Sequence, residues 1–433
     1  MAKGHPGMLK TVRIPTSELD IGMFVSDLDR PWLGTPFITQ GFMVKSAQDL
    51  ARVRHYCEYV YIDRRRSRMT LGQKNQQPLP QPDRDEAGKW KERKRVPIQQ
   101  IFEGRPIQLY QDSARWEEEY PRAQQVLDTL RVDIDSIFDD VVEGDKLNVI
   151  KLRKSVDPIV DSIGRNPDAC LWVCRLKQHD QYTYKHSLGA AIWAVSLGRQ
   201  LGLPRHDLRS LSMGCMLMDI GKLRIDQSLL RTERDLTDAE TAELASHVQH
   251  GLDILEECGI LNQDVIDMVA YHHERYDGSG YPLGLGRDKI PPFARIAGIV
   301  DTYDAITSDR DYAQPISPSE AIKLLYKSRD VDFQAELVEA FIQAIGLYPA
   351  GTLVELSSGE VAVVVAEYRT RRLRPKVMVL LDRHKKRLPK WKVVDLHALE
   401  NDDTQPTLVI NRSLEPAAYG IDLSEIPFQD IVA

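Results

Sequence analysis

Histidine and aspartate residues recur at five places in the middle of the chain, and their types suit a metal centre. They are Asp180 with His186, Asp219, His247, the pair His272 and His273, and Asp301. Neutral imidazoles and carboxylates are common ligands of divalent transition metals, and one carboxylate can bridge two ions. Two ions about 3.5 to 4 Å apart can generate a hydroxide near neutral pH and stabilise a phosphoryl group during in-line displacement. The set therefore predicts a two-metal hydrolase.

A helix must position His247. Thr237 and Glu240 form a Thr-x-x-Glu capping box, which predicts a helix that contains His247. His250 lies three residues further along the same face, but a packing role or a role behind the ligands explains it equally well, so it is not included among the ligands.

The adjacent residues His272 and His273 cannot both bind one ion from the middle of a regular helix. On a regular helix these side chains would point about 100° apart. Both can reach one ion only near a helix end, where the backbone can adjust. The turn sequence Asp-Gly-Ser-Gly that begins at Asp277 supplies such an end.

Periodicity and composition divide the 433 residues into several parts. The predicted fold class is multidomain, with a mainly α-helical domain, a small N-terminal β-containing domain and a small C-terminal β extension. The predicted parts are an N-terminal domain over residues 9–63, a polar linker over 64–110, the helical domain over 111–346, the β extension over 347–400, and a tail over 401–433.

Composition excludes several classes of protein. Apolar residues make up 42% and charged residues 28%, as in globular proteins that fold in water. A formal net charge of −7 gives no general electrostatic basis for a nucleic-acid partner. No apolar run is long enough to cross a bilayer, and no signal peptide is evident, so the sequence predicts a cytoplasmic protein without a transmembrane segment.

Several segments resemble the HD-GYP domain family, in the family's order. Residues 272–282 read HHERYDGSGYP and resemble its HHExxDGxGYP signature, and residues 219–222 read DIGK and resemble the end of its HDIGK signature. Residues 247–251 and 301–312 also match. The motifs span about 130 residues, and their joint occurrence makes chance improbable. The N-terminal stretch resembles a small domain often placed before such domains. The resemblance implies a metal-dependent phosphodiesterase that cleaves cyclic di-GMP to pGpG, and in a further step to GMP, with a two-metal-activated hydroxide.

The resemblance also implies roles for individual residues. The implied metal ligands are His186, Asp219, His247, His272, His273 and Asp301, with Asp219 bridging two divalent ions of iron or manganese; magnesium, nickel and zinc are alternatives. Asp180 and Lys222 match a pair that assists the nucleophile and the leaving oxygen beside Asp219. Tyr281 would stack on a guanine, and Arg310 would bind a phosphate together with Lys222.

Two positions depart from the family pattern and keep other functions open. Met218 stands where the family has the histidine of its HD pair, and Ala313 stands where a basic residue is frequent. The alternative is a degenerate domain that acts as a non-catalytic cyclic di-GMP sensor or adaptor. Its GYP loop would contact a diguanylate cyclase of the GGDEF type. A third hypothesis is an HD-type phosphohydrolase of another nucleotide, and a homodimer is a further expectation.

Overall fold

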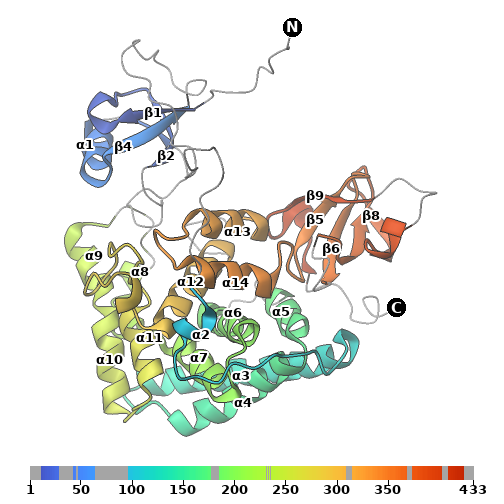
Figure 1. Ribbon diagram of the computed structural model, residues 1–433, viewed down its shortest axis with the longest axis horizontal. Helices are drawn as coiled ribbons and strands as arrows, with labels where there is room; N and C mark the ends of the chain where they lie inside the picture. Colours follow the sequence, from blue (N-terminus) through green and yellow to red (C-terminus); the bar gives the residue numbers. More distant parts are fainter. Residues whose placement is uncertain are drawn as a thin grey trace. The chain divides into compact units, whose positions relative to one another are not determined.

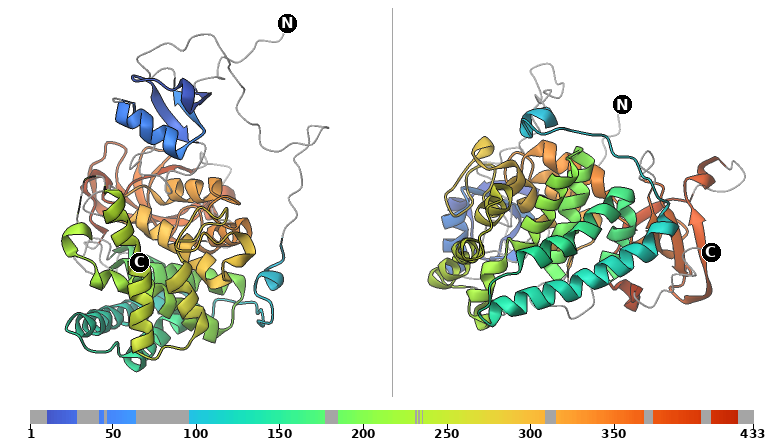
Figure 2. Two further views of the ribbon diagram at one scale, coloured as in Figure 1. Left: turned by 90° about the vertical axis from the view of Figure 1, so that its left-hand side faces the viewer. Right: turned by 90° about the horizontal axis from the view of Figure 1, so that it is seen from below.

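The computed structural model describes residues 11–28, 42–44, 47–63, 96–176, 185–230, 232, 234, 236–308, 315–367, 373–401 and 408–423. The chain divides into two compact units, residues 1–95 and 96–433. Most elements of both units are labelled in Figure 1, and Figure 2 shows the same ribbon from two further directions.

The first unit is a four-stranded antiparallel sheet with one helix. Its elements are β1 (Thr11–Pro15), β2 (Phe24–Leu28), β3 (Phe42–Met43), α1 (Ala47–Tyr56) and β4 (Tyr59–Asp63). The strand order is β1-β4-β2-β3. Val53 of the helix and Val25 and Val60 of the sheet are fully buried in one apolar core. This unit confirms the predicted small N-terminal β-containing domain.

The second unit is mainly helical. Its longer helices are α3 (Trp116–Val142), α4 (Val149–Arg165), α5 (Pro167–Leu176), α6 (Lys185–Leu201), α7 (Arg205–Leu217), α9 (Asp238–Ala245), α10 (His247–Glu257), α11 (Gln263–Tyr271), α12 (Pro292–Thr307), α13 (Pro318–Lys327) and α14 (Ala335–Ile345). Helix α6 lies at the centre and packs against α7, α12 and α14, while α3 and α4 run side by side (Figure 2). Trp193 of α6 and Tyr303 of α12 are fully buried, with ring centroids 5.1 Å apart. No helix in the described ranges has both the length and the apolar composition needed to cross a bilayer.

The segment before α3 is attached to this helical core from Val96 onward. It contains the short helix α2 (Ile98–Ile101), and Phe102 is only 1% exposed. The Phe102 ring meets that of Phe293 edge to face at 6.1 Å. Composition predicts a linker up to residue 110, but its last fifteen residues, 96–110, contribute buried apolar side chains to the domain. Residues 64–95 lie outside the described part of the chain.

A five-stranded antiparallel sheet follows the helices, as the change to a two-residue period predicts. Its strands are β5 (Leu353–Leu356), β6 (Val361–Ala366), β7 (Lys376–Leu381), β8 (Arg387–Asp395) and β9 (Ile410–Ser413), in the order β8-β7-β6-β5-β9. Val361 and Val363 face the helical core, whereas Ala362 and Val364 belong to a second apolar cluster. Both faces of β6 are therefore covered, and β9, which lies beyond residue 400, completes the sheet.

Candidate metal centre

Five of the six predicted metal ligands lie at the ends of helices. His186 is the second residue of α6, Asp219 immediately precedes the 3-10 helix η4 (Ile220–Arg224), His247 opens α10, and His272 and His273 follow the end of α11. Asp301 lies inside α12. The helix end predicted for the adjacent histidines is present, because α11 stops at Tyr271.

The helix that carries His247 differs from the prediction. The capping box is formed, since the side chains of Thr237 and Glu240 bind each other's backbone N–H groups. The helix that it starts, however, ends at Ala245, and Ser246 separates it from α10. The Ser246 hydroxyl donates to the carbonyl of Glu243 at 2.6 Å, a local bond that competes with continued helix. His247 therefore begins a new helix instead of lying within the capped one.

The six predicted ligands form two groups that share Asp219. In each group one candidate ligand atom per residue lies within 4.8 Å of the others. The first group is called the three-histidine pocket and consists of Asp219, His247, His272 and His273. The second is called the carboxylate pocket and consists of His186, Asp219 and Asp301. The position of Asp219 in both groups is what a bridging carboxylate requires.

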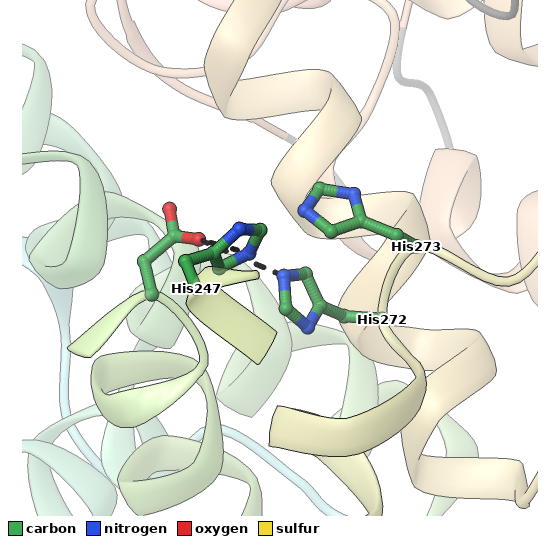
Figure 3. Close-up of side chains that lie close together, drawn as sticks. His247, His272 and His273 are labelled. Carbon is green, nitrogen blue, oxygen red and sulfur yellow. Dashed lines mark ion pairs between the residues drawn. The ribbon is translucent and has the colours of Figure 1, made fainter. Parts of the chain in front are cut away.

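The three-histidine pocket has donor atoms that suit a cation (Figure 3). Oδ1 of Asp219 lies 3.5 Å from Nε2 of His247 and 3.6 Å from Nε2 of His272. The Nδ1–H of His247 donates to the Leu244 carbonyl at 2.7 Å, and that of His272 donates to the Met268 carbonyl at 3.0 Å. These bonds fix the tautomer and leave the Nε2 lone pairs directed into the pocket.

Four atoms of this pocket lack hydrogen-bond partners among the described residues. Nε2 of His247, His272 and His273 and Oδ1 of Asp219 are buried and make no hydrogen bond there. Buried acceptors without partners are costly, and a divalent cation would satisfy all four together. The residues present therefore fit a metal ion.

The pKa shifts of three of the four residues agree with this fit. Burial lowers the pKa of His247 to about 4. Burial and the neighbouring His272 hold the pKa of His273 well below its usual range. Burial alone would raise the pKa of Asp219, but Lys222 and His272 outweigh it and hold that pKa well below the ordinary value. Neutral imidazoles and an ionised carboxylate are the forms that bind metals.

The carboxylate pocket is held together by internal contacts. Nε2 of His186 lies 3.0 Å from Oδ1 of Asp301 and 3.7 Å from Oδ2 of Asp219. Its Nδ1 lies 2.8 Å from Oδ2 of Asp304. Burial would lower the pKa of His186, but the contacts with Asp301 and Asp304 raise it to about 9. The carboxylates on both sides of His186 therefore favour the charged form of its imidazole.

Lys222 is placed beside the centre by a close approach of two helices. Its Nζ donates to Oδ2 of Asp219 at 2.6 Å, and its side chain is 35% exposed. A Cβ atom on Gly221 would lie 1.9 Å from the carbonyl oxygen of His247. Only glycine lets η4 approach α10 this closely, and the approach brings Asp219 and Lys222 to the histidines.

Tyr281 lies over the three-histidine pocket. Its ring stacks on that of His273, with centroids 4.6 Å apart and planes inclined by 21°. The following loop is bound by Glu274, whose buried carboxylate accepts the N–H groups of Leu283 at 2.7 Å and Leu285 at 2.8 Å. Glu274 thus holds the loop that positions Tyr281.

Four further positions carry predictions from the sequence. Met218 is fully buried at the end of α7 and belongs to the main apolar core. Asp180 and Arg310 lie outside the described residues, as does Ala313.

The structure adds Glu274 and Asp304 to the residues singled out from the sequence. Both lie inside the matched motifs, and those motifs are the signal in the sequence that could have identified them. Their contacts depend on how distant segments pack, so composition and periodicity do not reveal their roles.

Comparisons with known proteins agree with this architecture. Family models match an HD domain over residues 174–337, a domain of unknown function over residues 11–151, and a KOW domain associated with the HD domain over residues 353–421. The HD-domain match contains all six residues of the two metal pockets.

Curated relatives extend the match to nearly the whole chain. A cyclic di-GMP phosphodiesterase of Pseudomonas aeruginosa is 33% identical over 391 residues, which cover 90% of this chain and 89% of the relative. A cyclic di-GMP phosphodiesterase response regulator of Xanthomonas campestris is 36% identical over 34% of this chain and 39% of its own length. A 3′3′-cGAMP-specific phosphodiesterase of Vibrio cholerae is 32% identical over 37% of this chain and 31% of its own length. Because the match to the Pseudomonas protein spans both chains almost completely, this chain belongs to the HD-GYP family of HD-domain phosphodiesterases.

Proposed function

We propose that this chain hydrolyses cyclic di-GMP to linear pGpG, and in a second step to GMP, at its metal centre. The observation that carries the proposal is the position of Asp219. Its Oδ1 faces His247 and His272, while its Oδ2 faces His186 and Lys222. The choice of substrate is supported by the Pseudomonas relative, which is named for cyclic di-GMP and matches nearly the whole chain.

The two pockets would each hold one divalent cation. Iron and manganese are the proposed ions, with magnesium, nickel and zinc as alternatives, because imidazole and carboxylate ligands suit all of them to different degrees. When bound, such ions supply Lewis acidity toward a phosphoryl oxygen and lower the pKa of a water molecule. Asp219 would bridge them, and its low pKa keeps the carboxylate ionised for this role.

Hydrolysis requires a proton and positive charge at the leaving group. A water oxygen forms a bond to phosphorus while the bond from phosphorus to the 3′ oxygen breaks, and that oxygen takes up a proton. Lys222 stands at the edge of the centre, partly exposed, so its ammonium would stabilise the developing negative charge or donate this proton. Asp180, assigned from the sequence alone, would orient the water or accept its proton.

Two residues would recognise the nucleotide. Tyr281 presents an aromatic ring beside the metal centre and is 36% exposed, so a guanine can stack on it. Arg310 would contact a phosphate with its planar guanidinium, an assignment that rests on the sequence alone.

The test is a turnover assay under reducing conditions with iron or manganese. We expect cleavage of cyclic di-GMP to pGpG, and loss of cleavage in Asp219→Ala, because this change removes a ligand from both pockets. Product analysis over time separates pGpG from GMP. The proposal is wrong for the natural sequence if the wild type leaves cyclic di-GMP intact while Met218→His cleaves it.

Met218 favours a second candidate function. A buried thioether next to Asp219 is a soft, neutral group that replaces an imidazole poorly for iron or manganese. In that case the chain would bind cyclic di-GMP without turnover and act as a sensor or adaptor, with Gly280, Tyr281 and Pro282 contacting a diguanylate cyclase. Metal-dependent turnover that Asp219→Ala abolishes would exclude this role.

The turnover assay should also include cyclic GMP-AMP as a substrate, because a Vibrio relative is named for it.

A further inference from the structure

The two metal pockets differ in what their donor atoms already bind. In the three-histidine pocket, three imidazole nitrogens and one carboxylate oxygen are buried and have no hydrogen-bond partner among the described residues. They come from three separate helix ends, and two of the imidazoles are fixed by backbone carbonyls. An entering cation would find four ligands already directed at it and would break no hydrogen bond of these atoms.

In the carboxylate pocket the corresponding atoms are engaged with one another. Nε2 of His186 lies 3.0 Å from Oδ1 of Asp301, and Oδ2 of Asp219 binds the ammonium of Lys222 at 2.6 Å. An entering cation must break both contacts. It must also approach the positive charge of Lys222, which is unfavourable at such short range.

The number of ligands adds to this difference. The three-histidine pocket offers four protein ligands, whereas the carboxylate pocket offers three, one of which is shared. Met218 immediately precedes Asp219 and is fully buried, but it provides no nitrogen or oxygen ligand. The fourth protein ligand adds a bond to the ion that the carboxylate pocket cannot supply, so the three-histidine pocket should hold its ion more firmly.

We infer that the two pockets fill unequally. The three-histidine pocket retains one divalent ion in the isolated protein, whereas the carboxylate pocket binds its ion weakly and reversibly. If the proposed function holds, on which this regulatory consequence rests, turnover rises and falls with the concentration of free divalent cation. Lys222 then acts as an internal competitor that occupies Asp219 until the second ion arrives.

Metal content tests the inference without any substrate. Protein is loaded with manganese, passed through a desalting column and analysed for metal per chain. We expect about one retained ion for the wild type and about none for His247→Ala, which removes one of the four ligands of the three-histidine pocket. Met218→His adds an imidazole beside Asp219, and we expect it to retain a second ion. Met218→Leu is the matched control, since it keeps a buried apolar side chain and should retain one.

Calorimetric titration of manganese into the metal-free wild type gives a second measurement that does not depend on whether the Met218 variants fold. Two binding events with dissociation constants at least about tenfold apart are expected. Lys222→Met should tighten the weaker event, because it removes the competing ammonium. Two retained ions in the wild type, or two events of equal affinity, would overturn the inference.

The two proposals can fail separately. A protein that retains one ion but leaves cyclic di-GMP intact contradicts the proposed function and not the unequal pockets. A protein that cleaves cyclic di-GMP and retains two ions contradicts the unequal pockets and not the proposed function.

Discussion

Oδ2 of Asp304 lies 2.8 Å from Nδ1 of His186, and Oδ1 of the same carboxylate accepts the indole N–H of Trp193 at 2.9 Å. His186 and Trp193 both belong to α6, so one carboxylate of α12 orients two rings of the neighbouring helix. Asp304 is only 2% exposed, so water cannot readily take its place. The contact directs Nε2 of His186 toward Asp301 and the carboxylate pocket.

Asp304 should therefore act as a positioning residue. We expect Asp304→Asn to weaken manganese binding in the carboxylate pocket by about 10- to 100-fold, the usual effect of losing a group that orients a ligating imidazole. The measurement is the manganese concentration that gives half-maximal turnover, together with calorimetry. Ser308→Ala is the control, because its hydroxyl donates to the same Oδ2 at 3.2 Å. Equal manganese affinity in the two variants would contradict the role.

Gly221 should be intolerant of a side chain. Its added Cβ would lie 1.9 Å from the carbonyl oxygen of His247, so Gly221→Ala must push η4 away from α10. We expect a loss of about 1–3 kcal/mol in the free energy of unfolding, measured by urea denaturation, and weaker metal retention. Gly164→Ala is the control, because nothing lies within 4 Å of its added Cβ and the position is helical. That change should be neutral or stabilise by up to about 1 kcal/mol.

Glu274 should affect substrate binding more than metal binding. Its carboxylate holds the N–H groups of Leu283 and Leu285, so Glu274→Gln loses at least one of two charge-assisted hydrogen bonds and loosens the loop after Tyr281. We expect KM for cyclic di-GMP to rise about tenfold, a loss of about 1.4 kcal/mol of binding, with the metal content unchanged. Glu256→Gln, at an exposed position of α10, removes the same charge as a control. A fall in kcat at constant KM would contradict this role, because it would show that the loop affects the chemical step and not substrate binding.

Asp332 should make stability depend on pH. Burial raises its pKa from 3.8 to about 6, although Arg275 opposes the shift. The folded protein then holds this proton more tightly than the unfolded chain, so the stabilisation is complete below the ordinary pKa and is lost as pH rises through about 6. Between about pH 4 and 7, the free energy of unfolding should fall in the wild type by up to about 3 kcal/mol more than in Asp332→Asn. The free energy of unfolding is measured by urea denaturation at each pH. An equal change with pH in the wild type and in Asp332→Asn would contradict this role of Asp332.

The sequence predicts which residues come together at the metal centre better than it predicts the contacts and helix ends that position them. Five of the six predicted ligands lie at helix ends and Asp301 lies inside α12, and the structure brings all six into the two pockets; their roles as ligands stay predictions. The helical and sheet regions can be predicted from the spacing of apolar residues, because an element with one buried face repeats apolar residues at its own period. The break at Ser246 was not predicted, since a capping box marks where a helix starts and not where it ends.

Contacts between distant segments are the part that the sequence does not reveal. His186 and Asp304 are 118 positions apart, and β9 joins β5 across more than fifty residues. Such pairings depend on how whole helices and strands pack, and no local pattern encodes them. The attachment of residues 96–110 was missed for the same reason, because a few apolar side chains in a polar segment decide it.

The stack between Tyr281 and His273 restricts where the proposed guanine could bind. One face of the Tyr281 ring is covered by the imidazole at a centroid distance of 4.6 Å. If Tyr281 stacks on a guanine as proposed, the base would lie on the opposite face, with the phenol ring between the base and the imidazole. In that arrangement the purine would not contact the imidazole directly. A movement of the base would affect His273 only by moving the Tyr281 ring.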